Sequence, residues 1–112
     1  MQQAEISEFG GLGYEVYEWR HASAILKADF PSEWGDVCHV LQQWRIKESS
    51  VVRGGGGRTD IAQEHDGLFQ QRGWTKKRFD TEIVVDEESY KSPTHEVDCY
   101  KSRVALELDW NN

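Results

Sequence analysis

The sequence contains few of the features that would mark an exported, membrane-bound or strongly basic protein. It has 112 residues with only two cysteines, two prolines and one methionine, and 13 Lys and Arg stand against 20 Asp and Glu, a net charge of −7. A protein that holds nucleic acid by bulk charge should be basic overall, so that simplest kind of partner is excluded. Residues 1–10 contain no base and no apolar run, which excludes a signal peptide, and no stretch approaches the ~18 apolar residues of a membrane span. We therefore expect a cytoplasmic protein that does not contact a membrane.

Sequence motifs for zinc and for nucleotides are also missing. Cys38 and Cys99 have no CxxC or CxxH spacing, and the four histidines show no ligand spacing, so we expect reduced thiols that pack as small apolar groups. The run Gly54–Gly57 lacks the Lys-Ser/Thr ending of a P-loop, so nucleotide hydrolysis is not supported. Aromatic residues, by contrast, are plentiful, with five Trp, four Tyr and four Phe. The chain therefore has the apolar area to fold as a single domain over residues 1–112 with a small core.

Hydrophobic periodicity predicts an α/β protein whose helices precede its strands. A helix is expected over 32–46, with Ser32 as its N-cap and with an apolar face formed by Trp34, Val37, Leu41 and Trp44. A second helix is expected over 61–72, with Thr59 or Asp60 as its cap and Gly73 as its stop. Its inward-facing residues are expected to be Ile61, Leu68 and Phe69. The other expected elements are strands at 13–19, 81–85, 97–100 and 104–110, a short helical turn at 21–28, a glycine-rich loop at 51–59, a basic link at 74–78 and a polar turn at 86–93.

Charge is distributed unevenly along the chain. Residues 50–80 carry 6 bases and 4 acids, whereas residues 81–112 carry 3 bases and 8 acids. Two interpretations of the basic segment stay open: contacts with DNA phosphates, helped by the exposed amides of the glycine run, or an ordinary solvated surface. The candidate phosphate ligands are Arg53, Arg58, Arg72, Lys76, Lys77 and Arg78.

Three carboxylates are predicted to gather near the C-terminal end. Glu107 and Asp109 share one face of the last strand, because side chains alternate along a strand. Asp98 lies on the preceding strand, and the short turn at 101–103 brings it opposite or diagonal to Glu107. Converging carboxylates repel each other unless a cation lies between them, and oxygen ligands favour Mg²⁺ or Mn²⁺ over zinc. The same pattern is also typical of an amphipathic strand whose acids are simply solvated.

The sequence around these carboxylates reads VDCYKSRVALELDWNN over residues 97–112, with KRFD upstream over residues 77–80. It resembles the active-site strand pair of BglII-type restriction endonucleases, which belong to the PD-(D/E)xK nuclease superfamily. The resemblance implies that Asp98 and Glu107 are catalytic metal ligands, helped by the main-chain carbonyl of Leu108. Asp109 occupies the third catalytic position, where most relatives have lysine. An aspartate there can act as a base or bind a second ion, but it supplies no positive charge.

The resemblance also implies a fold, a reaction and a partner. The fold would be a restriction-endonuclease-like α/β core, with N-terminal helices packed on a small mixed sheet. The function would be that of a type II-like restriction endonuclease, a homodimer that uses Mg²⁺ to hydrolyse phosphodiester bonds in double-stranded DNA. The alternative is a catalytically silent DNA-binding or protein-interaction module with the same fold, which Asp109 in place of lysine favours. The superfamily core continues beyond this strand, so we expect a truncated chain first, and otherwise a natural fragment or a core completed by another copy.

Overall fold

The computed structural model describes residues 1–45 and 57–109, apart from the side chains of residues 57–59. Helices and strands are both present, so the predicted α/β class is confirmed. No helix in this described part is long and apolar enough to cross a membrane. The elements in chain order are β1 (Gln2–Ala4), a 3-10 helix η1 (Ser7–Phe9), β2 (Val16–Glu18), α1 (Ala22–Asp29), α2 (Pro31–Gln43), α4 (Gly57–Gln70), β3 (Thr75–Phe79), β4 (Glu82–Val85), β5 (Glu88–Lys91), β6 (His95–Lys101) and β7 (Val104–Leu106).

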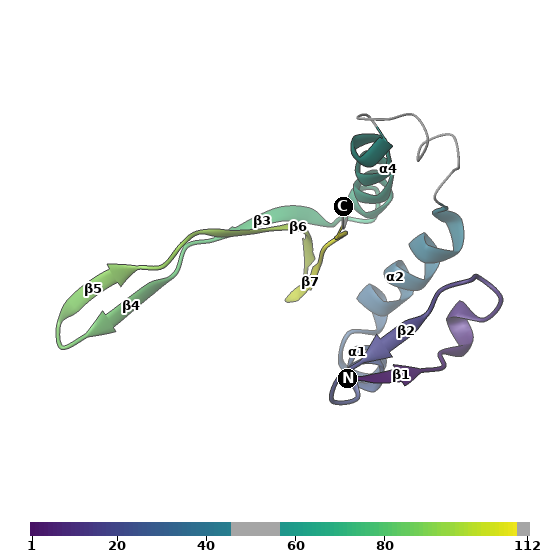
Figure 1. The fold of residues 1–112 in the computed structure, drawn as a ribbon, viewed down its shortest axis with the longest axis horizontal. Coiled ribbons are helices and arrows are strands. Elements are labelled where there is room, and N and C mark those ends of the chain that lie inside the picture. Colours follow the sequence, from purple (N-terminus) through teal and green to yellow (C-terminus); the bar gives the residue numbers. More distant parts are fainter. Residues whose placement is uncertain (46–56, 110–112) are drawn as a thin grey trace.

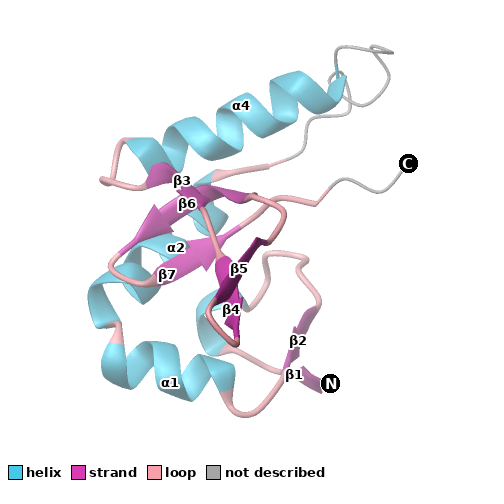
Figure 2. Ribbon diagram, turned by 90° about the vertical axis from the view of Figure 1, so that its left-hand side faces the viewer, coloured by secondary structure: helices cyan, strands magenta, loops and turns pink. Residues whose placement is uncertain are grey.

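The strands form three small antiparallel sheets, β1–β2, β3–β6–β7 and β4–β5. Helix α4 packs against β6, α2 packs against α4, and α1 packs against α2 (Figure 2). The hairpin of β3 and β6 continues outward as β4 and β5, which project away from the helices (Figure 1). The centre of the fold is therefore the sheet β3–β6–β7, the sheet that carries Asp98.

Aromatic side chains connect α2, α4 and the sheet into one core. The Trp44 and His65 rings lie 5.2 Å apart, His65 and Phe69 5.1 Å, and Phe69 and Trp74 5.2 Å. Burying each large aromatic side chain contributes roughly 2–3 kcal/mol. Gly73 has a φ of 91°, which an L side chain rarely adopts, and this turn after α4 delivers Trp74 into the core. The remaining buried members of this cluster are Val40, Ile61 and Cys99.

Helix α2 differs from its prediction at its start and in its buried face. It begins at Pro31 with Phe30 as its N-cap, so Ser32 is not the cap, because proline fits the first helical position. Val40 and Trp44 are buried, but Leu41 is only half-buried. Asp36 is buried instead, one turn before Val40. The buried face of α2 is therefore rotated relative to the face predicted from spacing, and the Asp36 carboxylate lies on it.

Helix α4 and the strands also differ from their predicted bounds. The helix begins at Gly57, so Thr59 and Asp60 lie inside it rather than at its cap, and most of the predicted glycine loop lies outside the described residues. The predicted basic link is strand β3, and the predicted polar turn at 86–93 contains strand β5. Asp86 and Glu87 alone make the turn, with φ values of 49° and 69°, the left-handed geometry of a two-residue hairpin. Strand β7 ends at Leu106, short of the predicted end at residue 110.

Candidate functional site

Strands β6 and β7 set two acidic residues against each other. The register pairs Cys99 with Leu106 and Lys101 with Val104. Continued by one residue, this register puts Asp98 opposite Glu107. The two-residue turn of Ser102 and Arg103, with φ values of 50° and 70°, fixes this register between β6 and β7. The assignment of Asp98 and Glu107 as metal ligands stays a prediction, and this strand pairing is what supports it.

An irregularity in the sheet lies at Asp98. Thr75 of β3 pairs with Tyr100, but Lys77 pairs with Val97, so the register shifts between these pairs. One β3 residue, Lys76, is therefore opposed by two residues of β6, which are Asp98 and Cys99. Such a bulge bends a strand and re-aims its side chains, and bulges are common beside active sites. The bulge gives Asp98 and Cys99 a backbone environment that the other residues of β6 do not have.

The three predicted catalytic carboxylates differ in exposure. Asp98 is half-buried, and Glu107 and Asp109 are exposed just beyond the end of β7. Glu107 Oε1 lies 3.5 Å from His95 Nε2, so the carboxylate has a cationic neighbour when His95 is protonated. Among the described residues, the carboxylates of Asp98, Glu107 and Asp109 are not gathered within 4.8 Å of one another. Mg²⁺ usually binds one or two carboxylates and keeps several waters, so the opposed pair of Asp98 and Glu107 suits it.

The basic candidates lie in different parts of the molecule. Lys76, Lys77 and Arg78 are exposed on β3, next to the strand that carries Asp98. Lys76 Nζ lies 3.6 Å from Glu96, Arg78 Nε lies 3.4 Å from Asp80, and Lys77 Nζ lies over the Phe79 and Tyr100 rings. Exposed ion pairs of this kind are weak, so the bases can exchange their partners for phosphates. Arg53 and the side chain of Arg58 lie outside the described residues.

Arg72 takes part in a buried network rather than in a free basic surface. Asp36 on α2 accepts hydrogen bonds from Arg72 at 3.0 Å, from the Trp74 indole at 2.9 Å and from Lys101 at 2.9 Å. Burial alone would raise the pKa of Asp36, but the bonds from Lys101, Trp74 and Arg72 outweigh it and lower that pKa. Lys101 also donates to the Arg72 main-chain oxygen at 2.7 Å. The network ties α2 and the end of α4 to the last residue of β6, three positions after Asp98.

Sequence reasoning missed Asp36, although a signal for it was present. On the predicted helix, Asp36 lies four residues before Val40 and eight before Trp44, positions that share one face at helical spacing. An acid on an apolar face needs donors, because a buried unpaired charge is costly. The pairing with Lys101, which is 65 residues away, could not be read from the helix alone.

A second cluster of polar groups lies in the core between α4 and β6. His65 Nδ1 lies 2.8 Å from Asp66 Oδ1, and Cys99 Sγ donates to the same oxygen at 3.8 Å. Burial, and then the Asp66 charge, raise the pKa of the Cys99 thiol to about 12. Within the described ranges, these are the three possible metal ligands whose atoms all lie within 4.8 Å of one another. His65 and Cys99 both contact Asp66, which is the one carboxylate of the three. The cluster therefore does not match the oxygen-only site predicted from sequence. Cys38 and Cys99 are both free and buried, which confirms the predicted packed thiols.

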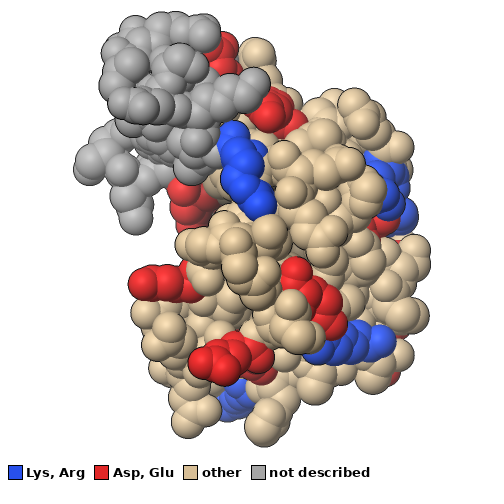
Figure 3. All heavy atoms as spheres, turned by 90° about the vertical axis from the view of Figure 1, so that its right-hand side faces the viewer, with Lys and Arg blue, Asp and Glu red and all other residues tan. Residues whose placement is uncertain are grey.

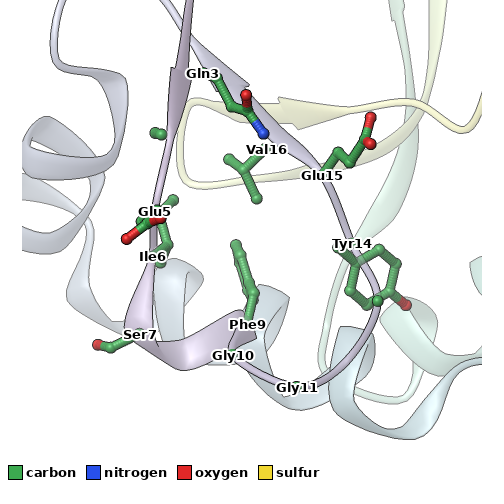
Figure 4. Close-up of a pocket in the computed structure, with 12 residues that line it drawn as sticks. Gln3, Glu5, Ile6, Ser7, Phe9, Gly10, Gly11, Tyr14, Glu15 and Val16 are labelled. Atoms are coloured by element: carbon green, nitrogen blue, oxygen red, sulfur yellow. The ribbon is translucent and has the colours of Figure 1, made fainter.

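A hollow of about 530 Å³ lies between β1, η1 and β2 (Figure 4). Among the described residues that line it, the charged ones are Glu5 and Glu15, which repel phosphate. The face of the molecule drawn in Figure 3 carries acids and bases interspersed, without a continuous basic area in the part that is coloured.

Comparison with known proteins gives the family. No curated protein and no solved structure matches the chain. A family model, restriction endonuclease BglII/BglIII, matches residues 14–112, which include α2, α4 and all strands from β2 to β7. Restriction endonucleases generally use divalent metal ions and act on DNA, in keeping with Asp98 on β6, Glu107 just after β7 and the bases on β3. The chain therefore belongs to the BglII/BglIII family of restriction endonucleases.

Proposed function

We propose that this chain is one nuclease-like domain that hydrolyses phosphodiester bonds in double-stranded DNA, as a type II endonuclease does. It would act as a homodimer in the cytoplasm, where Cys38 and Cys99 stay reduced. The observation that carries the proposal is the strand register that places Asp98 opposite Glu107, next to a bulge, in a chain of the BglII/BglIII family. We propose Mg²⁺ as the ion, with Mn²⁺ able to replace it.

Asp98, Glu107 and the main-chain carbonyl of Leu108 would hold the ion. When bound, Mg²⁺ supplies positive charge that stabilises the phosphoryl oxygens and the leaving 3′ oxygen. Asp109 would accept the proton of the attacking water, since it follows Glu107 on the same side of the extended chain and is exposed. His95 would keep Glu107 oriented from the neighbouring strand.

The bases of β3 would hold the DNA backbone beside these acids. Lys76, Lys77 and Arg78 lie on the strand that pairs with β6, so phosphates bound there would lie close to Asp98. Arg53 and Arg58 would add contacts from the segment before α4. Bases next to acids also offset the repulsion between the phosphates and a chain of net charge −7.

Plasmid cleavage tests this proposal directly. Supercoiled DNA is incubated with the chain and Mg²⁺ or Mn²⁺, and nicked and linear products are measured for the native chain, Asp98→Ala and Glu107→Ala. We expect cleavage by the native chain and none by either variant, while Glu82→Ala, an exposed acid on β4, cleaves as the native chain does. Cleavage that survives both substitutions would overturn the site.

The catalytically silent module is the alternative outcome of the same experiment. It is favoured by Asp109, which stands where most relatives have lysine. It would be supported if the native chain cuts no DNA with either ion but still binds duplex DNA in a salt-sensitive way.

A further inference from the structure

The cluster of His65, Asp66 and Cys99 brings three kinds of metal ligand together between α4 and β6. His65 Nδ1 and Cys99 Sγ lie 2.8 Å and 3.8 Å from the same atom, Asp66 Oδ1, and all three ligand atoms lie within 4.8 Å of one another. His65 and Asp66 are neighbours on α4, whereas Cys99 lies on β6, 33 residues after Asp66. Because the ligands come from two elements that meet only in the tertiary fold, no CxxC or CxxH spacing marks this site in the sequence.

The distances within the cluster suit a tetrahedral ion. Zinc binds histidine nitrogen and carboxylate oxygen at about 2.0–2.2 Å and thiolate sulfur at about 2.3 Å, so tetrahedral angles put neighbouring ligand atoms roughly 3.3–3.7 Å apart. The two contacts of Asp66 Oδ1, at 2.8 Å and 3.8 Å, lie on either side of that range. Side-chain shifts of about half an ångström would therefore make room for the ion.

The chemistry of the three ligands selects the ion. Mg²⁺ prefers oxygen ligands in an octahedron, whereas a thiolate and an imidazole favour zinc. The cluster offers one sulfur, one nitrogen and one oxygen, and three protein ligands leave the fourth tetrahedral position for a water. This donor set distinguishes the cluster from Asp98 and Glu107, which offer only oxygen.

The surroundings of the cluster are also those of a metal site. His65 is 3% exposed and Cys99 1% exposed, and the rings of Trp44 and Phe69 lie 5.2 Å and 5.1 Å from the His65 ring. An apolar shell of this kind keeps bulk water from the ligands and fixes their orientation. The Asp66 side chain is 24% exposed, so an ion can reach the cluster from the solvent at this residue.

We infer that His65, Asp66 and Cys99 form a Zn²⁺ site that joins α4 to β6. As the ion binds, the Cys99 S–H bond breaks, its proton leaves to the solvent and a zinc–sulfur bond forms, while His65 carries its proton on Nε2. Cys99 follows Asp98 and shares the bulge opposite Lys76, so the ion would hold the backbone beside the proposed Mg²⁺ ligand. The inference does not rest on DNA cleavage.

Cobalt binding tests whether sulfur is a ligand. Co²⁺ can replace zinc in such sites, and a thiolate bound to it gives a sulfur-to-cobalt charge-transfer band in the near ultraviolet. We expect this band at one Co²⁺ per chain for the native chain and for Cys38→Ser, and its loss in Cys99→Ser. Cys38 is the matched control, because it is also a free, buried thiol but lies on α2. A native chain that binds Co²⁺ without this band would overturn the site.

Zinc affinity, measured by competition with a chromophoric chelator, tests the other ligands. Asp66→Asn should weaken zinc binding at least about tenfold, and Cys99→Ser about a hundredfold. Glu64→Gln removes an exposed acid from the same helix and should bind zinc as the native chain does. Asp66 is only half-buried, so its substitution tests the site even if Cys99→Ser fails to fold, which far-UV circular dichroism reports.

Stability completes the test, because an ion that binds only the folded chain stabilises it. Zinc should raise the urea midpoint of the native chain and of Glu64→Gln but not that of Asp66→Asn. Equal zinc affinity in all variants would overturn the site and leave the three groups as a hydrogen-bonded cluster. Asp98→Ala and Glu107→Ala should abolish cleavage and keep the native zinc affinity, so a failure of the proposed function cannot be mistaken for a failure of this site.

Discussion

Lys101 Nζ lies 2.9 Å from Asp36 Oδ2, and this contact joins the end of the strand that carries Asp98 to the middle of α2. The Asp36 side chain is 9% exposed and is also held by Arg72 and Trp74. Removing one partner of a buried pair costs more than the pair itself contributes, because the other charge is left without compensation. The contact is therefore a polar connection between α2 and the strand of the proposed site.

Asp36→Asn should lower the free energy of unfolding by about 2 kcal/mol, because the buried Asp36 loses its charge and the half-buried Lys101 ammonium loses its carboxylate. Urea unfolding followed by Trp fluorescence measures the change. Glu64→Gln removes an exposed acid from α4 and should alter stability by less than about 0.5 kcal/mol. Equal stability of Asp36→Asn and the native chain would show that the network does not hold the sheet.

The same carboxyl should make stability depend on acid pH. The pKa of Asp36 is lowered from its ordinary value of 3.8, so the folded chain binds its proton less readily than the unfolded chain. Its contribution to stability is fully present above the unfolded pKa and is lost as the pH falls through the lower native pKa. The difference in unfolding free energy between the native chain and Asp36→Asn should be constant from pH 7 to about pH 5 and shrink below about pH 4. A difference that does not change with pH would argue against an ionised Asp36.

Replacing Lys76, Lys77 and Arg78 together with Ala should weaken binding to duplex DNA of any sequence. Each phosphate contact that is lost lowers the slope of log affinity against log salt by about one, so the triple variant should lower it by up to about three. Fluorescence anisotropy in EDTA, where no cleavage occurs, measures the slope. Lys27→Ala removes a base on α1, beside Glu8 and Trp34, and should keep the native slope.

Asp109→Asn should reduce plasmid cleavage by about a hundredfold or more if Asp109 accepts the proton of the attacking water. The amide keeps the shape of the side chain but cannot take the proton. Asp109→Lys introduces the lysine of the PD-(D/E)xK pattern and should be more active than Asp109→Asn. Undiminished cleavage by Asp109→Asn would remove the proposed base from the mechanism and leave Asp98 and Glu107 untouched.

Cys99 and Cys38 should react slowly with a disulfide reagent in the folded chain. Burial raises the pKa of both thiols, that of Cys99 to about 12, so little thiolate is present at pH 8. Addition of urea should release two fast-reacting thiols per chain, and Cys38→Ser should release one. Rapid reaction of Cys99 without denaturant would show that β6 separates from α4 in the native state.

Local pattern predicted the elements whose apolar residues follow a helical or alternating spacing. The inward positions Ile61 and Phe69 of α4 are buried, and the strand pair around Asp98 is antiparallel with a short turn, as expected. Strand β3 was missed because Lys76, Lys77 and Arg78 are all exposed, and a strand exposed along most of its length shows no alternation. Strand β5 was missed because a hairpin turn usually contains glycine, whereas Asp86 and Glu87 adopt the left-handed conformation without it.

The long-range features of the site could not be predicted from sequence. The bulge at Asp98 depends on how β3 and β6 are offset, which no periodicity in either strand encodes. The spacing of the histidines predicts no ligand role for His65, and the residue is buried against Trp44 and Phe69. Its neighbour Cys99 comes from the other end of the chain, so their meeting depends on the tertiary fold.

The two-residue turn of Ser102 and Arg103 also bears on the order in which the chain folds. It closes a loop of a few residues between Asp98 and Glu107, whereas the contact of Asp36 with Lys101 closes a loop of 65 residues. Short loops lose less entropy on closing and form faster, so the β6–β7 hairpin can form before the helices dock on it. Mutations in α2 should therefore reduce the amount of folded protein without changing which acids face each other.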